Sequence, residues 1–187
     1  MLRKLSLAAF ALIAAPAFAQ EDGAGPNIVI EVDGQAKGQI VIDLADHVAP
    51  KHVAQIVALA KEGAYDDVVF HRVIDGFMAQ TGDVQYGKAG GSAQAGMGGS
   101  SKPDLAAEFS NLTFDRGVVG MARSADPNSA NSQFFIMFAP APHLDGQYTV
   151  VGKVISGMDV VDAIKKGEGG NGEVSSPDRM AKVTVQD

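Results

Sequence analysis

The chain of 187 residues contains no cysteine, and this absence excludes several classes of function. Without thiols it cannot use a cysteine nucleophile, form disulfides or build a cysteine-based metal site. The sequence also lacks an excess of basic residues. It has 15 lysines and arginines and 22 aspartates and glutamates, which gives a formal charge of −7. A net negative charge opposes general binding to nucleic acid or to anionic lipid.

Long apolar runs are scarce, and the clearest one lies at the beginning of the chain. Arg3 and Lys4 precede an apolar stretch at residues 5–15, and Ala17-Phe18-Ala19 follows as a small-x-small pattern. This order is typical of a secretory signal peptide, whereas a membrane-spanning helix needs about 20 apolar residues. We therefore expect residues 1–19 to be removed, which leaves 13 basic and 22 acidic residues and a formal charge of −9.

The rest of the chain is long enough for one domain with a complete core. We expect a flexible N-terminus at residues 20–26 and a single domain at residues 27–187. No later segment is apolar and long enough to hold the mature protein in a membrane. A bacterial periplasm is the expected location, with secretion outside the cell as the alternative, and a monomer is the expected state.

Apolar residues that alternate along the chain, separated by turn residues, predict a series of short strands. Eight are expected, at residues 27–32, 38–44, 68–74, 77–81, 117–122, 133–138, 148–155 and 180–186. Pro50 is suited to open a helix that ends before Gly63, and a second short helix fits residues 158–166. This order favours one antiparallel barrel with helices covering its ends.

Three large polar side chains stand on strands that are otherwise apolar. Arg72 lies in the apolar stretch at residues 68–74, where a guanidinium is costly to desolvate. Strand periodicity places Gln80 on one face with Met78, and Gln133 on one face with Phe135. Because a core rarely accommodates three such groups, the pattern argues against plain core packing as the role of Arg72, Gln80 and Gln133.

Two common kinds of site have little support in this sequence. The four histidines are at positions 47, 52, 71 and 143, a spacing that fits no zinc pattern, and no cysteine can complete a site. No G-x-S-x-G sequence for a serine hydrolase is present. A metal-binding or scaffold role therefore rests only on scattered histidines, and we expect neither a metal nor a cofactor.

Several blocks match, in order and spacing, those of one enzyme family. They are Phe70-His71-Arg72-Val73-Ile74, Gly76-Phe77-Met78-Ala79-Gln80-Thr81-Gly82-Asp83, Gly120-Met121-Ala122-Arg123, Asn131-Ser132-Gln133-Phe134-Phe135-Ile136 and Leu144-Asp145-Gly146. On these motifs the chain resembles the cyclophilin-type peptidyl-prolyl cis-trans isomerases, of an exported bacterial type, over about residues 27–187. The resemblance implies a mainly β fold: a closed eight-stranded antiparallel β-barrel capped by two α-helices.

The resemblance also implies a role for each site residue. Arg72 would be the catalytic arginine. Gln80 and Gln133 would form hydrogen bonds with the substrate backbone, and the backbone of Ala122 and Arg123 would pair with the residues before the proline.

An apolar pocket for the substrate proline ring is implied in the same way. Its walls would be Phe77, Met78, Phe135 and Leu144. Tyr148 completes the substrate-binding set, at a position where the family often has histidine. His143 stands where many members have a tryptophan, just before the Leu-Asp-Gly motif.

These residues suit the rotation of an Xaa-Pro peptide bond, whose barrier is about 18–20 kcal/mol. In the twisted transition state the proline nitrogen regains its lone pair, and a fixed guanidinium then binds it better than the ground state. We therefore predict an isomerase that assists the folding of exported proteins and whose partners are proline-containing polypeptides. The alternative is a module that binds proline-containing segments, or acts as a chaperone, with little turnover, but a pure binder does not need the charge of Arg72.

Overall fold

The computed structural model describes residues 22–90 and 93–186. The signal peptide predicted at residues 1–19 lies outside the described residues, as does the beginning of the segment predicted to be flexible. Residues 22–26 contain no helix or strand. Within the described ranges, no helix is long and apolar enough to cross a membrane.

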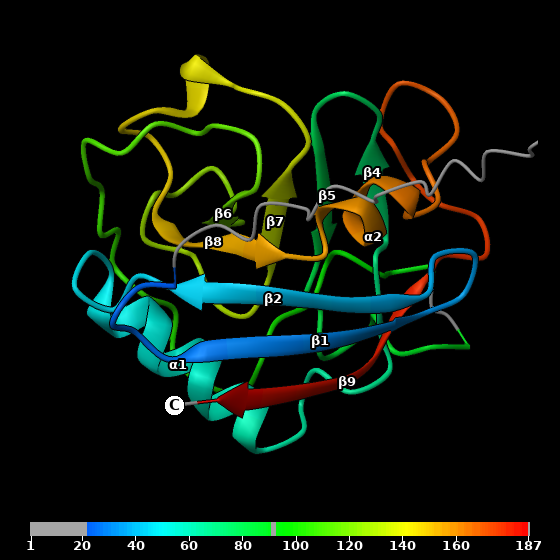
Figure 1. Cartoon of the computed structure of the whole chain (residues 1–187), viewed down its shortest axis with the longest axis horizontal. Coiled ribbons are helices and arrows are strands. Elements are labelled where there is room, and N and C mark those ends of the chain that lie inside the picture. The colour runs from blue at the N-terminus through cyan, green and yellow to red at the C-terminus, as the bar shows by residue number, and fades with distance from the viewer. Residues whose placement is uncertain (1–21, 91–92, 187) are drawn as a thin grey trace, which may run out of the picture.

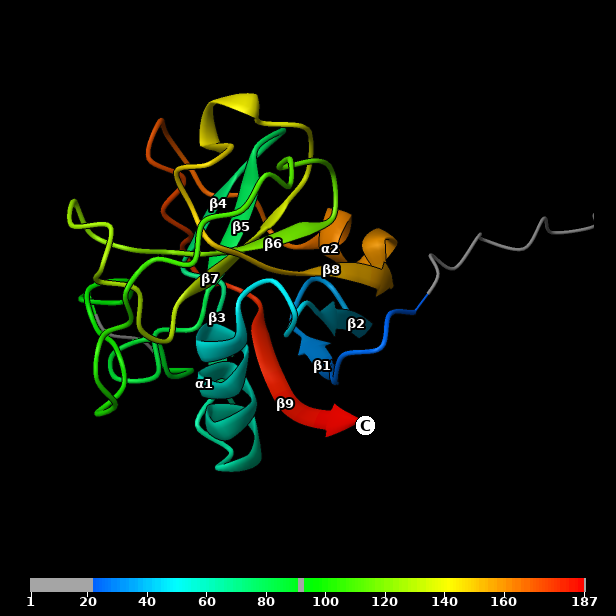
Figure 2. The same cartoon turned by 90° about the vertical axis from the view of Figure 1, so that its left-hand side faces the viewer.

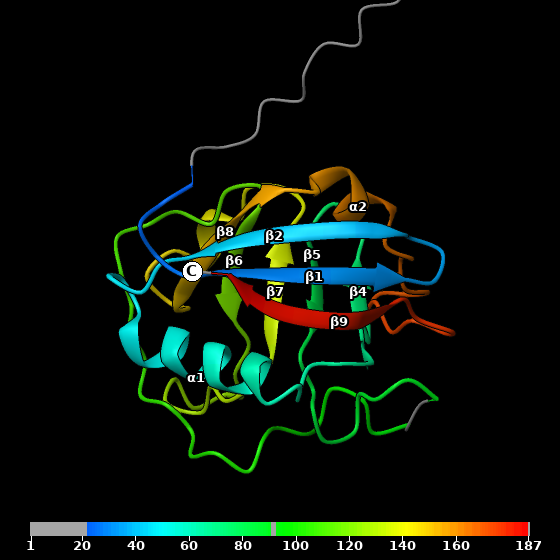
Figure 3. The same cartoon turned by 60° about the horizontal axis from the view of Figure 1, so that its bottom comes forward.

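Nine strands form one antiparallel sheet that curls around the core (Figures 1 and 3). They are β1 (Asn27–Asp33), β2 (Gly38–Leu44), β3 (Val68–Val69), β4 (Arg72–Ile74), β5 (Met78–Thr81), β6 (Val118–Met121), β7 (Phe134–Met137), β8 (Val150–Ser156) and β9 (Arg179–Gln186). Their order in the sheet is β3-β9-β1-β2-β8-β6-β7-β5-β4. The fold is therefore mainly β, as predicted.

The predicted closed barrel of eight strands is wrong, because the strand expected at residues 68–74 is interrupted. β3 pairs with β9, whereas β4 pairs with β5 at the other end of the sheet. Between them, the Phe70 N–H donates to the Asp178 carbonyl and the His71 carbonyl accepts from the Val174 N–H. The sheet thus has nine strands and two edges, β3 and β4, which are joined by two residues of chain rather than by a ladder of hydrogen bonds.

Two α-helices accompany the sheet, as predicted (Figure 2). α1 (Pro50–Lys61) begins at its proline and packs against β9, and Gly63 follows its end with a φ of +68°. α2 (Met158–Ala163) packs against β2 and is shorter than the predicted range 158–166. A 3₁₀ turn, η1 (Pro142–Leu144), precedes β8.

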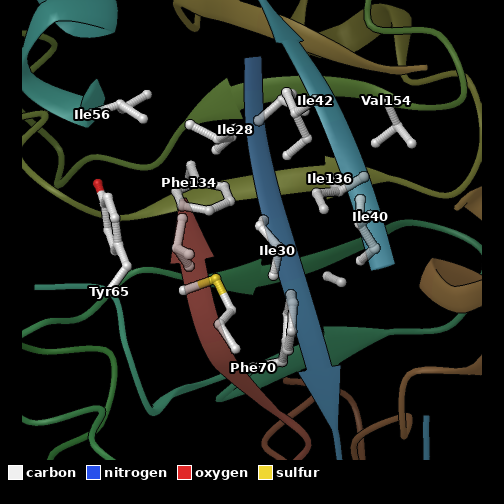
Figure 4. Packing of buried hydrophobic residues seen from close by; sticks show 14 of the residues in the cluster. Ile28, Ile30, Ile40, Ile42, Ile56, Tyr65, Phe70, Phe134, Ile136 and Val154 are labelled. Atoms are coloured by element: carbon white, nitrogen blue, oxygen red, sulfur yellow. The ribbon is translucent and has the colours of Figure 1, made fainter. Parts of the chain in front are cut away.

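The main core fills the space inside the curled sheet and beneath α1 (Figure 4). The buried side chains labelled there are Ile28, Ile30, Ile40, Ile42, Ile56, Tyr65, Phe70, Phe134, Ile136 and Val154. Tyr65 satisfies its hydroxyl by donating to the Ser132 carbonyl at 2.9 Å. Side chains of both β5 and β7 belong to this core, and both strands also carry site residues.

The first turn of α1 is capped by a residue from a distant loop. Ala49 offers no capping side chain, and the first turn contains no acidic residue. Glu108 supplies both: its Oε2 accepts from the backbone N–H groups of Lys51 and His52, each at 3.1 Å, and lies 2.6 Å from Nδ1 of the His52 ring. Such a carboxylate satisfies free N–H groups and complements the helix dipole. Glu108 therefore ties the loop before β6 to α1.

Glu108→Gln is expected to lower the free energy of unfolding at pH 7 by about 1–3 kcal/mol, because charged hydrogen bonds are lost. Burial alone would raise the pKa of Glu108, but the hydrogen bonds from the ring and backbone of His52 and from Lys51 outweigh it and lower the pKa below 4.5. A lowered folded-state pKa gives stability that is present above the unfolded value and is lost as the pH falls through the folded value.

Urea unfolding at several pH values would test this expectation. The difference between the wild type and Glu108→Gln should be full at pH 7 and shrink below about pH 4.5, where the unfolded carboxyl begins to bind protons. Glu31→Gln, which changes an exposed glutamate of β1, is the matched control. A difference that stays constant down to pH 3 would contradict the assigned role of the carboxylate.

Candidate active site

A cleft of about 330 Å³ opens at the edge of the sheet that carries β4 and β5. Its lining residues are Arg72, Phe77, Met78, Gln80, Ala122, Arg123, Phe135, His143, Leu144 and Tyr148. The cleft thus gathers every predicted site residue except Gln133, and it adds His143. Gln133 lines a second cavity of about 550 Å³, which shares Gln80, Ala122 and Arg123 with the cleft.

Strand register explains why residues so far apart in sequence meet here. Arg72 of β4 is opposite Gln80 of β5, Gln80 is opposite Phe135 of β7, and Phe135 is opposite Gly120 of β6. Directly opposed residues of antiparallel strands project from the same face. Gly120 leaves room for the side chain of Phe135, because a Cβ at position 120 would lie 2.6 Å from Cζ of Phe135.

The floor of the cleft is a second apolar cluster, separate from the main core. Its buried members are Met78, Phe114, Val118, Phe135, Met137, Ala141, Leu144 and Val150. Phe77 and Tyr148 pack against it while remaining partly exposed, and Phe135 stacks on Phe114 with ring centroids 5.7 Å apart. The cluster presents aromatic and aliphatic surface to the cleft, which suits a small apolar ring.

Arg72 is held from two sides at the rim of this cleft. Its Nη1 donates to Oε1 of Gln80 at 3.2 Å, and its Nε donates to the carbonyl of Asn171 at 2.9 Å. The carbonyl comes from a turn at residues 167–174, which covers the outer edge of β4: the Val73 N–H donates to the Gly172 carbonyl at 2.7 Å. In the described part of the chain no carboxylate forms an ion pair with Arg72, so its charge is oriented without being neutralised.

A chain of hydrogen bonds continues from Gln80 into the glycine-rich loop. Nε2 of Gln80 donates to Oε1 of Gln133 at 2.9 Å, and Nε2 of Gln133 donates to the carbonyls of Gly96 and Gly98 at 2.9 and 2.8 Å. The N–H groups of these two glycines donate in turn to Oδ2 of Asp83 at 2.7 and 2.9 Å. Both glutamines are thus linked, through the backbone of Gly96 and Gly98, to the buried carboxylate of Asp83.

The arrangement joins an apolar pocket to an oriented cation and two anchored amides. Residues 27–185 match the family model for cyclophilin type peptidyl-prolyl cis-trans isomerase/CLD. The chain belongs to this family. As a cyclophilin, it is a peptidyl-prolyl cis-trans isomerase.

Two related peptidyl-prolyl cis-trans isomerases support the assignment, one of them over nearly the full length. The chain is 54% identical to a probable peptidyl-prolyl cis-trans isomerase of Brucella suis biovar 1 over 97% of this chain and 94% of that protein. It is 42% identical to a peptidyl-prolyl cis-trans isomerase of Helicobacter pylori over 71% of this chain and 77% of that protein. The similarity therefore includes the segments that form the cleft.

Solved cyclophilin structures share the fold. AquaCyp293 from Hirschia baltica has a TM-score of 0.69 and 26% identity, and the match covers 84% of this chain and 73% of that chain. A cyclophilin type isomerase from Cryptosporidium parvum, crystallised in the presence of the dipeptide Ala-Pro, has a TM-score of 0.70 and 25% identity, covering 86% and 99%. The curled sheet with two helices is therefore the cyclophilin fold.

Two histidines of this cyclophilin lie at the site and differ in their surroundings. His143 lines the cleft and stacks on Phe77, with ring centroids 5.7 Å apart and planes inclined by 28°. His71 is buried behind Arg72, its ring lies where a side chain at Gly96 would stand, and burial lowers its pKa below the ordinary value. Burial thus favours the uncharged form of the His71 ring.

Sequence reasoning missed three contributors to the site. Asp83 and Gly120 were present in the matched motifs but had no assigned role, and the carbonyl of Asn171 lies in a segment that carried no motif. The Asp83 carboxylate accepts hydrogen bonds from backbone N–H groups, and Asn171 contributes its backbone carbonyl. Because backbone groups are the same in every residue, neither interaction leaves a recognisable pattern of side chains in the sequence. Gly120 gave the only usable signal, because a glycine inside a strand often marks a close approach of other groups.

Proposed function

We propose that the 330 Å³ cleft is where this cyclophilin catalyses prolyl isomerisation and that Arg72 is its catalytic residue. The observation that carries the proposal is the position of Arg72: its guanidinium, unpaired with any carboxylate in the described structure, borders an apolar pocket. The Cryptosporidium relative crystallised with Ala-Pro supports a proline-containing ligand. Phe77, Met78, Phe135, Leu144 and Tyr148 would enclose the proline ring.

The proposed mechanism uses no covalent intermediate. As the Xaa-Pro bond twists, amide resonance is lost and the proline nitrogen becomes a hydrogen-bond acceptor. A guanidinium N–H of Arg72 donates to it in the transition state and not in the planar ground state, which is what accelerates the reaction. Exclusion of water by the apolar floor strengthens this interaction.

The energies of these interactions are consistent with the rate acceleration that such a mechanism has to provide. A ~10⁵-fold acceleration corresponds to about 7 kcal/mol. One charge-assisted hydrogen bond supplies roughly 1.5–3 kcal/mol. Positioning by Gln80, Gln133 and the backbone of Ala122 and Arg123 would supply the rest, because these groups hold one side of the peptide while the other rotates.

Two-dimensional exchange NMR on an Xaa-Pro peptide would test the proposed site directly. Catalytic amounts of the protein should produce cis–trans exchange peaks, and excess peptide should shift the amide signals of residues lining the cleft. A module that only binds proline-containing segments would shift the same signals without exchange peaks. Exchange peaks with shifts confined to a surface elsewhere would contradict the assignment of this cleft.

We also propose that the protein is exported to the periplasm, where it assists the folding of other exported proteins as a monomer. The basic, apolar and small-residue order of residues 1–19 supports export, and the absence of cysteine leaves the mature domain independent of disulfide formation. Mass spectrometry of the protein from the periplasmic fraction should show a chain beginning at Gln20. A full-length chain in the cytoplasmic fraction would contradict export, and a processed chain in the culture medium would favour secretion.

A further inference from the structure

Positive charge gathers at the cleft although the chain as a whole is acidic. The cleft is lined by two arginines and by no carboxylate, in a protein of formal charge −7. Asp104 lines the adjoining cavity, where its Oδ1 accepts a hydrogen bond from Asn131 at 2.9 Å. The side chains that line the cleft thus carry a net positive charge.

The four arginines of the described chain divide into two pairs. Arg116 and Arg179 do not line the cleft and are neutralised, with ion pairs of 2.7 Å to Asp162 and 2.9 Å to Asp33. Arg72 and Arg123 line the cleft, and neither has a carboxylate within ion-pair distance in the ranges that the structure covers. Arg72 already has a place in the proposed mechanism, but the charge of Arg123 has none.

The guanidinium of Arg123 is held in place without losing its charge. Its Cζ lies 4.4 Å above the centroid of the Tyr148 ring, and its Nη1 and Nη2 donate to the carbonyls of Ser124 and Gln147 at 2.9 and 3.0 Å. Tyr148 in turn meets Phe135 edge to face, with centroids 5.8 Å apart. Carbonyls and an aromatic face orient a cation but leave its net charge available to a ligand.

Arg123 also lies at the boundary between the two cavities, because it lines both of them. A peptide whose proline occupies the 330 Å³ cleft and whose chain continues into the 550 Å³ cavity has to pass this side chain. We propose that Arg123 is a specificity-determining residue, which selects Xaa-Pro segments carrying an aspartate or glutamate within two residues of the proline. This inference rests on the proposed function of the cleft.

Peptides that differ only in one charge near the proline would test the inference. Glutamate, glutamine or lysine would be placed two residues before the proline in one series and one residue after it in another, with exchange NMR giving kcat/KM. In at least one series the glutamate peptide should exceed the glutamine peptide by about threefold to fivefold, and the lysine peptide by about tenfold, in line with partly exposed ion pairs. In 1 M NaCl, where the screening length is about 3 Å, the differences should shrink towards unity.

Three variants assign the preference to Arg123. Arg123→Gln should bring the three rates of a series to within about twofold of one another, whereas Arg123→Lys, which keeps the charge, should retain part of the preference. Arg179→Gln removes one positive charge that does not line the cleft and is already paired with Asp33, and it should leave the preference unchanged. A preference that survives in Arg123→Gln would overturn the inference.

The wild type alone also decides the question, should Arg123→Gln fold poorly. Equal rates for the glutamate, glutamine and lysine peptides in both series would overturn the specificity of Arg123 while leaving the isomerase assignment of the cleft intact. An absence of exchange with every peptide, glutamine included, would instead contradict the proposed function itself. The two failures are therefore distinguishable.

Discussion

Arg72→Ala is expected to lower kcat/KM for an Xaa-Pro peptide by about 100-fold, because it removes a charge-assisted hydrogen bond worth roughly 1.5–3 kcal/mol in the transition state. Stability should change little. The side chain is partly exposed and contacts Gln80 and the Asn171 carbonyl rather than the main core. Exchange NMR measures the rate, and thermal unfolding followed by circular dichroism measures the stability.

Arg72→Lys separates charge from geometry. An ammonium keeps the charge but lacks the planar fork whose separate nitrogens donate to Gln80 and to the Asn171 carbonyl, so it should recover only a small part of the rate. Thermal unfolding of Arg72→Ala well below the wild-type temperature would mean that Arg72 is structural, and a rate close to that of the wild type would remove it from the mechanism.

The pH profile offers an independent check on Arg72. Arginine does not titrate in the working range, so the rate should be nearly flat from about pH 6 to 9. Burial lowers the pKa of His71 below its ordinary value, which moves its titration away from the neutral part of that range. A steep dependence without unfolding would place a titrating group in the mechanism and would contradict a role carried by Arg72 alone.

Local pattern predicted most of the fold, and the departures have long-range causes. β2 has the predicted bounds because its alternation and flanking turns are unambiguous. The strand expected at residues 68–74 is divided because Asp178 and Val174, a hundred residues later, take the hydrogen bonds of Phe70 and His71. Similarly, α2 ends early where the Lys165 N–H donates at 2.7 Å to the Asp178 carboxylate instead of continuing the helix.

The site was predictable where a side chain contradicts its surroundings. Arg72, Gln80 and Gln133 are large polar groups on apolar strands, and such a conflict is visible in the sequence itself. The stacking of Arg123 on Tyr148 joins two loops and needs the tertiary structure. Asp83 was hidden for another reason: an aspartate followed by a glycine-rich segment looks like an ordinary exposed loop residue, whereas it is fully buried.

Asp83→Ala is expected to lower both stability and activity. The Asp83 carboxylate accepts four backbone hydrogen bonds, from Gln85 and Tyr86 at 3.0 and 2.8 Å and from Gly96 and Gly98 at 2.7 and 2.9 Å. An unsatisfied buried donor costs about 1–3 kcal/mol, and partial hydration of the loop recovers some of the loss, so we expect a decrease of about 3 kcal/mol in the free energy of unfolding. Urea unfolding would measure it.

The effect of Asp83→Ala on activity follows from the same contacts. Release of Gly96 and Gly98 frees the carbonyls that hold Gln133, and Gln133 in turn orients Gln80 beside Arg72. We expect kcat/KM to fall about tenfold at temperatures where the variant is still folded, because loosely held groups lose part of their positioning effect. Exchange NMR would measure the rate, and hydrogen exchange should show the amides of both glycines opening faster than those of β7.

Two further variants separate the Asp83 anchor from a general effect of charge. Asp126→Ala removes an exposed aspartate whose one side-chain contact is local, to the Asn128 N–H, and should leave stability and rate unchanged. Asp83→Asn keeps one acceptor oxygen but turns donors of its amide towards the donors of the loop, so it should fall between the wild type and Asp83→Ala. If Asp83→Ala loses stability but keeps the wild-type rate, the hydrogen-bonded chain from Asp83 to Arg72 supports the loop and does not reach the chemistry.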